Sequence, residues 1–576
     1  MSSHLDMSGF IAAVVEEEER KQEVQDGDDE DDDLDEDFDT NDNDSRSDLR
    51  PSYYHTPSTS YFRNARRLRD QKNARNKRML EAVAPRHEIL RNLPFFILFD
   101  TRLAIFREFI RRDQERRRGG YIDPRIRRLA HIRILQGGFH TSDIPERHQA
   151  EIQRGQIFTS AFEQFDRLGE GLKEPISITF VDKFGDREAG IDGGGVTKEF
   201  LTSLTGETFD PDNQEQLFIA NDENLLYPNP GKLESQKYLL QAAGVQDGTP
   251  EMKAAIEETL SHYRFLGRII GKCLYEGFLI DATFAGNFLL RWALTGGTTQ
   301  AAQESGYHAT MDDLRDLDES LYQGILKLKH YPGDVESDFG LNFTITDTFE
   351  VHSPTTSDPD RKETKSITRS LKPGGADIAV TNSNRPEYIY LLANYRLRRQ
   401  SWYQTNAFLR GLREIIQPMW LSMFNQSELQ HLVGGDTTEI DVDDLRRHTM
   451  YSGVYVIGDD QQEHPTIKLF WEVLEQMEDQ DRRKVVKFVT STPRAPLGGF
   501  GHLHPNFTIR DSVGTRNRRN PDNSVFYPLT EDDGEMRLPS TSTCVNLLKL
   551  PRYPNARVMR EKLLYAVNSG AGFDLS

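Results

Sequence analysis

Hydrophobic residues recur with helical or strand spacing only after about residue 88. Residues 1–88 lack such periodicity, so we expect a disordered leader there. The segment that follows predicts a packed, helix-containing region with a basic outer face. Its apolar positions are Phe95, Leu98, Leu103, Phe106 and Phe109.

Two internal segments have a clear periodicity. Ile176, Ile178 and Phe180 alternate with polar residues, which predicts a strand. The sequence YRFLGRIIGKCLYEGFLI (residues 263–280) repeats its apolar pairs every four residues, which predicts a helix. Cys273 lies on the apolar stripe of this helix, so we expect a small core residue that burial makes unreactive.

The remaining pattern predicts further helices and a break. The expected helices cover residues 311–330, 385–397, 404–424, 467–477 and 557–570. We expect polar loops at residues 351–370 and 511–533. Gly434 and Gly435 lie between apolar segments, which is typical of a hinge between two bodies. This mixture of helices and short strands predicts an α+β fold.

Composition narrows the classes of function. The chain has 576 residues, more than one core usually organises, and its net charge of −21 argues against a general nucleic-acid binder. The two cysteines form no disulfide framework or metal-ligand spacing, so a reducing compartment, cytoplasmic or nuclear, is expected. We find no signal peptide or transmembrane run and expect no membrane association. An acidic block (26–44) and a basic block (62–78) predict solvated tail. Two alternatives stay open: intramolecular binding of the acidic block to the basic block, and a nuclear-targeting role for the basic block.

Three consecutive glycines follow Asp192 in the sequence DGGG (residues 192–195). A phosphate-binding loop needs a longer spacing that ends in Gly-Lys-Ser/Thr, which is missing here. We therefore expect a tight turn before a helix, with Asp192 as its cap.

The second cysteine, Cys544, stands in LPSTSTCVNLLKLP (residues 538–551). Hydroxylated residues before it favour a loop, and the residues after it alternate as in a short strand. An amide-cleaving thiol needs a positioned base, and His502 and His504 lie about forty residues upstream. A thiol that accepts an acyl group from another thioester needs less activation. From the residues alone, buried packing remains an alternative role for Cys544.

This segment resembles the active-site segment of HECT-type ubiquitin ligases. The same family resemblance holds for EAGIDGGGVTKEFL, FLGRIIGKCLYEG, LKPGGADIAVTNSNRPEYIYLLANYRL, AFLRGL, KFVTSTPRAPLGGF and LLYAVNSGAGFDLS. It covers about residues 90–576 in the family's order. The segment at 90–170 looks most like the extended HECT domain of the proteasome-associated subgroup.

The resemblance implies a bilobal enzyme. A larger, mostly helical N-lobe would span 89–433, a flexible hinge 434–438, and a smaller α/β C-lobe 439–576. Cys544 would take ubiquitin from a ubiquitin-conjugating enzyme as a thioester and pass it to lysines of protein substrates. No metal or other cofactor is implied.

The resemblance also implies contact residues. Leu321, Ile325 and Tyr388 would line the groove for the conjugating enzyme, and solvent exposure should separate groove residues from core residues. Phe573 would orient ubiquitin or the acceptor. The family often has His where this chain has Ser542, and Phe or Met where it has Val545. These differences alter loop packing and leave the nucleophile in place.

Two other classes of function compete with the ligase. A catalytically inactive scaffold would bind a conjugating enzyme without forming a covalent adduct. A thiol hydrolase, such as a deubiquitinating enzyme, would need His502 or His504 within hydrogen-bond reach of Cys544.

Overall fold

The computed structural model describes residues 93–117, 148–188, 195–211, 213, 215–293, 310–352, 362–436, 439–457, 462–503, 505–512 and 537–569. The chain divides into two compact units, Met1–Ile122 and Asp123–Ser576. The leader expected at residues 1–88 lies outside the described residues. No helix in the described ranges is both long and apolar enough to cross a membrane.

In the first unit, the described residues form η1 (Pro94–Phe96) and α3 (Phe99–Arg117). Leu103, Phe106 and Phe109 are buried on α3, as the spacing predicts. Phe95 and Leu98 are exposed, so their assignment to the packed face was wrong. The helix begins only at Phe99, and both residues therefore precede its apolar stripe.

The first part of the second unit contains short strands and several helices. Their bounds are β1 (His148–Gln153), α5 (Ile157–Phe165), η3 (Asp166–Lys173), β2 (Ile176–Val181), α6 (Gly195–Thr208), β3 (Phe218–Ala220), β4 (Leu226–Pro228), α7 (Lys232–Ala242), α8 (Pro250–Glu276), α9 (Gly286–Leu290) and η4 (Arg291–Ala293). β1 and β2 pair in parallel, and β3 and β4 pair antiparallel. Ile176, Ile178 and Phe180 of β2 are buried, which confirms the predicted strand.

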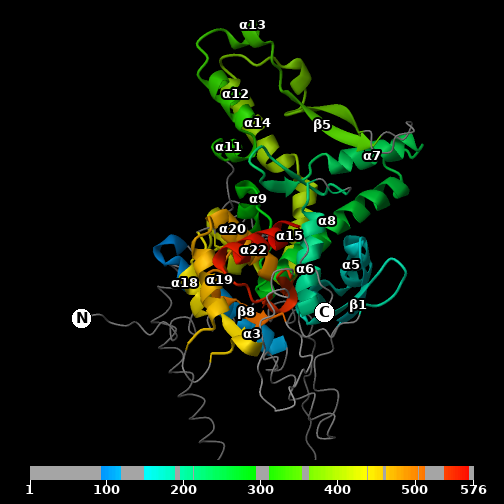
Figure 1. The fold of residues 1–576 in the computed structure, drawn as a ribbon. Helices are drawn as coiled ribbons and strands as arrows, with labels where there is room; N and C mark the ends of the chain where they lie inside the picture. The colour runs from blue at the N-terminus through cyan, green and yellow to red at the C-terminus, as the bar shows by residue number, and fades with distance from the viewer. Residues whose placement is uncertain are drawn as a thin grey trace, which may run out of the picture. The chain divides into compact units, whose positions relative to one another are not determined.

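Helices α8 and α15 (Trp402–Ile415) pack side by side (Figure 1). Glycines at the contact bring the two backbones unusually close. A Cβ added at Gly267 of α8 would lie 1.9 Å from the carbonyl oxygen of Phe408, and one added at Gly411 of α15 would lie 1.8 Å from that of Arg264. Side chains larger than hydrogen therefore cannot fit at these two positions without separating the helices.

Residues 313–399 hold a core of their own. The elements are α11 (Asp313–Leu317), α12 (Glu319–Lys329), α13 (Val335–Phe339), β5 (Thr344–His352), β6 (Lys362–Ser370), η5 (Gly375–Asp377), α14 (Arg385–Asn394) and the π-helix η6 (Tyr395–Arg399). The buried cluster runs from Leu314 to Leu397 and includes Phe343 and Val380. We call residues 313–399 the small subdomain.

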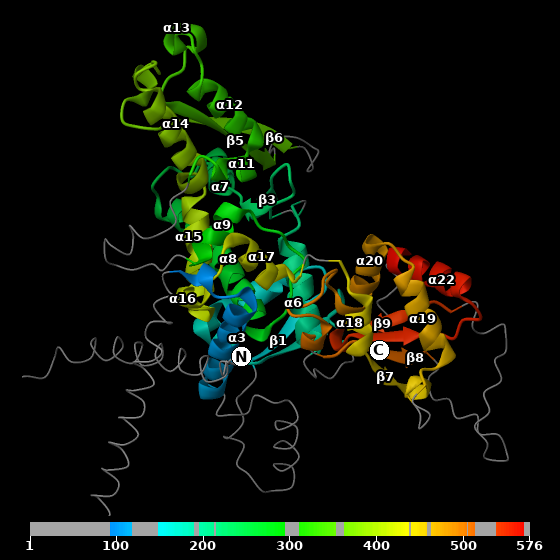
Figure 2. The same ribbon diagram turned by 90° about the vertical axis from the view of Figure 1, so that its left-hand side faces the viewer.

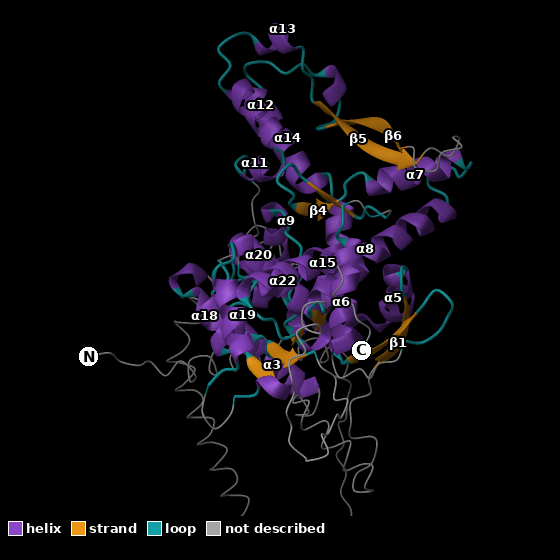
Figure 3. Cartoon of the chain, viewed as in Figure 1, coloured by secondary structure: helices purple, strands orange, loops and turns teal. Residues whose placement is uncertain are grey.

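Two expectations for the small subdomain were wrong. The single helix predicted at 311–330 is two helices, because Asp318 leaves helical geometry and its side chain accepts the backbone N–H of Leu321 as the cap of α12. The polar loop predicted at 351–370 contains strand β6. β6 pairs antiparallel with β5, beside α7 (Figure 3). The side chains of β6 are mostly polar, so its sequence lacks the alternation of apolar and polar residues that predicts a strand.

The rest of the second unit contains a mixed sheet and packed helices. The elements are α16 (Pro418–Leu421), α17 (Gln426–Gly434), α18 (Val442–Arg447), β7 (Met450–Ser452), η7 (Gly453–Tyr455), α19 (Pro465–Glu475), α20 (Asp479–Thr490), η8 (Phe500–His502), β8 (Thr508–Asp511), β9 (Ser540–Ser542), η9 (Thr543–Val545), β10 (Leu547–Leu550) and α22 (Ala556–Ser569). The strand order is β7-β8-β10-β9. Helices α19, α20 and α22 pack together beside this sheet (Figure 2). One buried cluster extends from Ile440 to Leu563.

The described residues thus form a mixed α+β structure, as predicted. Helices predicted from apolar spacing are present as α8, α14, α19 and α22. The single helix predicted at 404–424 was wrong in its extent, because α15 ends at Ile415, Ile416 is extended and α16 begins at Pro418. The lobe bounds 89–433 and 439–576 and the mobility of the hinge remain predictions. Most of the polar insert predicted at 511–533 lies outside the described residues, as does Asp192.

Candidate functional site

The backbone of Cys544 belongs to a short turn between two strands. η9 (Thr543–Val545) connects β9 to β10, which pair antiparallel with Leu547 opposite Ser542. β10 also pairs in parallel with β8, so it lies inside the sheet. Leu548 and Leu550 of β10 are fully buried in the core beneath the turn. Cys544 therefore occupies a connection between rigid strands, and Val545 beside it is 43% exposed.

Asn546 fixes the end of this turn. It adopts the left-handed conformation (φ 50°), which asparagine tolerates better than most residues, and it is completely buried. Its backbone N–H donates to the carbonyl of Thr543, and its own carbonyl accepts the N–H of Thr508. Its side-chain Nδ2 donates to the carbonyl of Pro505. The turn that carries Cys544 is therefore tied to the segment leading into β8.

The side-chain oxygen of Asn546 accepts a hydrogen bond from a residue far away in the sequence. Lys198 Nζ donates to Asn546 Oδ1 at 2.6 Å, and Lys198 is 8% exposed. Lys198 lies in the first turn of α6, which packs against η9, as does α20. The contact joins the VTKEFL segment to the cysteine turn.

Cys273 is a buried cysteine. It is 1% exposed on α8, and burial raises the pKa of its thiol to about 12. The thiolate is therefore essentially absent at neutral pH, and the predicted role as an unreactive core residue is confirmed.

The hydrolase alternative depends on two histidines. His502 is the last residue of η8 and is exposed, and its ring borders Gly498. His504 lies outside the described residues. The hydrolase alternative stays a hypothesis.

The residues expected to bind the conjugating enzyme lie in the small subdomain. Ile325 is 2% exposed and Tyr388 is 7% exposed, and both belong to its core. By the exposure criterion they are core residues that shape the surface from beneath. Leu321 is half-buried at the edge of that core on α12. Tyr390, two positions after Tyr388 on α14, is 65% exposed.

The glycine pair predicted as a hinge is closely packed. Gly434 ends α17, and Gly435 has a φ of 85°, which favours glycine. A Cβ at Gly435 would lie 2.6 Å from the carbonyl oxygen of Ala495 and 2.9 Å from Leu279 Cδ1. Both conformation and space therefore require glycine here. The hinge function of the pair is untested, and Phe573 lies outside the described residues.

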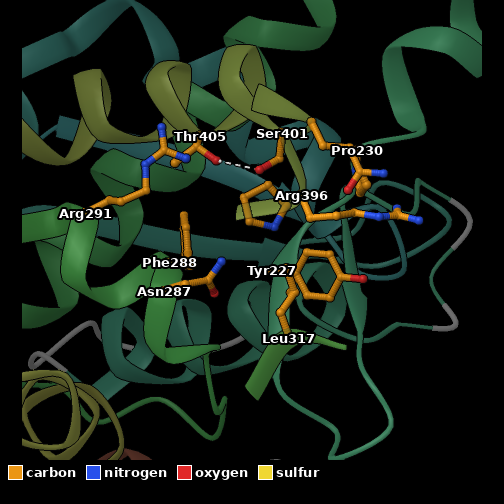
Figure 4. Close-up of a pocket in the computed structure, with 11 residues that line it drawn as sticks. Tyr227, Pro230, Asn287, Phe288, Arg291, Leu317, Arg396, Ser401 and Thr405 are labelled. Carbon is orange, nitrogen blue, oxygen red and sulfur yellow. Dashed lines mark hydrogen bonds between the residues drawn. The ribbon is translucent and has the colours of Figure 1, made fainter. Parts of the chain in front are cut away.

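A pocket lies away from these residues, between elements of the small subdomain and the first part of the unit (Figure 4). Its lining comprises Tyr227, Pro228, Pro230, Asn287, Phe288, Arg291, Leu317, Arg396, Gln400, Ser401 and Thr405. Burial, with repulsion from Arg398 and Arg413, lowers the pKa of Arg291 to about 10. The Arg291 guanidinium lies 5.6 Å from the ring of Trp402. None of the site residues predicted from the sequence lines this pocket.

Sequence reasoning missed Lys198 and Asn546. Asn546 follows Val545 at the point where the predicted strand pattern begins, and an asparagine there was a signal for a left-handed turn. Lys198 gave no comparable signal, because its partner lies 348 positions away.

Comparison with known proteins agrees with this geometry. A family model described as the HECT-domain (ubiquitin-transferase) matches residues 202–576, which include η9 and the second half of α6. A probable E3 ubiquitin protein ligase of Schizosaccharomyces pombe is 41% identical over 85% of the chain and 39% of its own length. E3 ubiquitin-protein ligase HUL5 of Saccharomyces cerevisiae is 37% identical over 88% of the chain and 47% of its own length. Ubiquitin-protein ligase E3B of Homo sapiens is 32% identical over 85% of the chain and 40% of its own length.

The chain thus spans somewhat less than half the length of these curated relatives. The family model covers well over half of the chain, and the cysteine turn and its support from β8 and β10 lie inside the matched region. The motifs around Cys544 indicate the same family. The chain is therefore a member of the HECT-domain family.

Proposed function

We propose that this chain is the catalytic part of a ubiquitin ligase in which Cys544 carries ubiquitin as a thioester. The observation that supports this most is the contrast between the two cysteines. Cys544 lies in a turn held by two strands, whereas Cys273 is buried with a pKa of about 12. A nucleophile on a short, rigid turn suits attack on a bulky protein thioester.

The proposed reaction has two acyl-transfer steps. The Cys544 thiolate attacks the thioester carbonyl carbon of ubiquitin, a new S–C bond forms, and the cysteine of the conjugating enzyme leaves as a thiolate. A lysine amine of the substrate then attacks the same carbonyl, the N–C bond forms, Cys544 leaves as a thiolate, and the amine proton passes to solvent. Both steps start from a thioester, so neither needs ATP or a metal ion.

The small subdomain is the proposed binding site of the conjugating enzyme. Leu321 offers a half-buried apolar side chain at its surface, and the buried Ile325 and Tyr388 hold that surface in shape. Leu321→Arg should therefore slow ubiquitin loading of Cys544. Gln323→Arg is the matched control, because Gln323 is an exposed residue on the same helix. Equal loading by both variants would move the binding site elsewhere.

Further steps of the proposal concern the product and the setting. Repeated transfer to lysines would build polyubiquitin chains that mark substrates for degradation, with the proteasome as a further partner. The setting would be cytoplasmic or nuclear, in keeping with two cysteines and no disulfide framework. Phe573 is proposed to orient ubiquitin or the acceptor during transfer, and Gly434 and Gly435 to let Cys544 move between partner and acceptor.

The test mixes the protein with activating enzyme, conjugating enzyme, ubiquitin and ATP, followed by a non-reducing gel. An adduct that thiol reductant removes is expected in the wild type and in Cys273→Ala, and not in Cys544→Ala. Binding of several conjugating enzymes without any adduct would overturn the ligase and leave an inactive scaffold.

A further inference from the structure

The hydrogen bond between Lys198 and Asn546 joins α6 directly to the residue that ends the cysteine turn. We propose that Lys198 is a positioning residue that holds this turn in place while ubiquitin passes from Cys544 to the acceptor amine. The inference rests on the proposed function. It concerns the second acyl-transfer step.

Asn546 is well suited to receive such a contact. It is completely buried, and its two backbone groups and its Nδ2 are already bonded to Thr543, Thr508 and Pro505. Its side-chain oxygen accepts a hydrogen bond from outside this part of the fold, donated by Lys198 Nζ at 2.6 Å. A hydrogen bond from a charged donor is about twice as strong as one between neutral groups. A shift of Asn546 would carry the adjoining η9 with it, because the residues are contiguous.

Lys198 is held from a rigid base. The neighbouring Thr197 donates its hydroxyl to the carbonyl of Ile176 in β2 at 3.2 Å. On the other side, Glu199 accepts a hydrogen bond from Arg154 at 2.7 Å. The first turn of α6 is therefore tied to the β1–β2 pair, and Lys198 can act as a fixed point for the turn.

The two partners lie on opposite sides of the proposed hinge at residues 434–438. The bond therefore exists only in arrangements where the cysteine turn is next to α6. Helix α6 is not part of the small subdomain, which is the proposed binding site of the conjugating enzyme, so loading at that site would not need this contact. Hence the contact is assigned to the transfer step, and its loss should leave loading intact.

The experiment separates the two steps. The full chain is loaded in a single turnover from a charged conjugating enzyme, loading is stopped, and free lysine or a substrate lysine is added while the adduct is followed on non-reducing gels. Variants are Lys198→Met, Lys198→Arg, Asn546→Ala and the double variant of Lys198→Met with Asn546→Ala. Lys253→Met is the matched control, because Lys253 is an exposed lysine on α8.

Lys198→Met is expected to load at a rate within about twofold of the wild type and to discharge about tenfold or more slowly, because a buried bond to a charged group is lost. Lys198→Arg keeps a donor and should recover part of the discharge rate. The double variant should discharge no more slowly than Asn546→Ala alone, because Lys198 acts through Asn546. Thermal melting of each variant checks that it is folded.

Three results would overturn the inference. One is discharge by Lys198→Met at the wild-type rate, and another is loading that falls as much as discharge. The third is independent, multiplicative effects of the two substitutions. Failure of the wild type to form any adduct would instead overturn the proposed function, so the two failures are distinguishable.

Discussion

The contact of α8 with α15 at Gly411 offers a quantitative test of the fold. In Gly411→Ala, the new Cβ of α15 would lie 1.8 Å from the carbonyl oxygen of Arg264 and 3.1 Å from the backbone N of Arg268. Both are backbone atoms of α8 and cannot rotate away as a flexible side chain could. An ordinary contact needs about 3.4 Å or more, so α8 and α15 must separate locally by roughly 1.5 Å.

That separation has a calculable range of cost. Overpacking a well-packed core typically costs about 1–3 kcal/mol, and backbone clashes belong at the upper end. Replacing glycine by alanine inside a helix by itself gains about 1 kcal/mol. Separating the helices also weakens the packing of Phe408 and Leu412, which are almost completely buried on α15. We expect a net loss of about 3 kcal/mol in the free energy of unfolding.

The control is Gly324→Ala on α12, where an added Cβ meets no atom within 4 Å and φ is negative. This variant should be more stable by up to about 1 kcal/mol, because only the helix propensity changes. Guanidinium unfolding followed by tryptophan fluorescence reports on the site, since Trp292 lies 5.6 Å from the ring of Phe408. A chain with several cores need not unfold in one step. The midpoint to compare between variants is therefore that of the transition that Gly411→Ala shifts.

Gly267→Ala places the same kind of clash on the opposite helix, 1.9 Å from the carbonyl oxygen of Phe408. Because one separation relieves both clashes, the double variant with Gly411→Ala should lose less than the sum of the single losses. Gly411→Ala within about 0.5 kcal/mol of the wild type would refute the close packing, provided that Gly324→Ala behaves as expected. Strict additivity of the pair would refute the shared origin of the two clashes.

Three further predictions address other parts of the chain. Gly435→Ala should lower the free energy of unfolding by at least about 1 kcal/mol, because φ is 85° and a Cβ would clash with the carbonyl oxygen of Ala495. A melting temperature equal to that of the wild type would count against this prediction. In the folded protein iodoacetamide should label Cys544 and spare Cys273 from pH 6 to 9, as measured by mass spectrometry, because burial raises the pKa of the Cys273 thiol from 9.0 to about 12. The same rise in pKa means that Cys273 contributes to the free energy of unfolding below pH 9, and that this contribution is lost between pH 9 and 12. Early labelling of Cys273 would contradict both statements. Glu414→Gln should lower the free energy of unfolding, measured in urea, by about 1–2 kcal/mol, because Glu414 pairs with the buried Arg268 but is itself 32% exposed. An unchanged urea midpoint would show that water replaces the ion pair.

Features that depend on neighbouring residues could be predicted from the sequence. Helical spacing placed Cys273 on a buried face, and alternation placed Ile176, Ile178 and Phe180 in a buried strand. The local chemistry around Cys544 was also readable, since hydroxylated residues and a short apolar run predict a loop entering a strand. The strand after the cysteine is confirmed as β10, but the loop predicted before it was wrong, because Ser540–Ser542 form strand β9 against β10. Short-range periodicity is sufficient in these cases, because it follows directly from backbone geometry.

Tertiary structure alone decided the features that depend on distant partners. Strand β6 is polar and becomes a strand only because β5 supplies its hydrogen bonds. Gly267 and Gly411 lie in ordinary helical sequence, and only the packing of α8 on α15 shows that neither can carry a side chain. Lys198 and Asn546 are separated by 348 positions, and no local pattern records their contact. Local periodicity specifies which face of an element is buried, but only the folded chain specifies what that face meets.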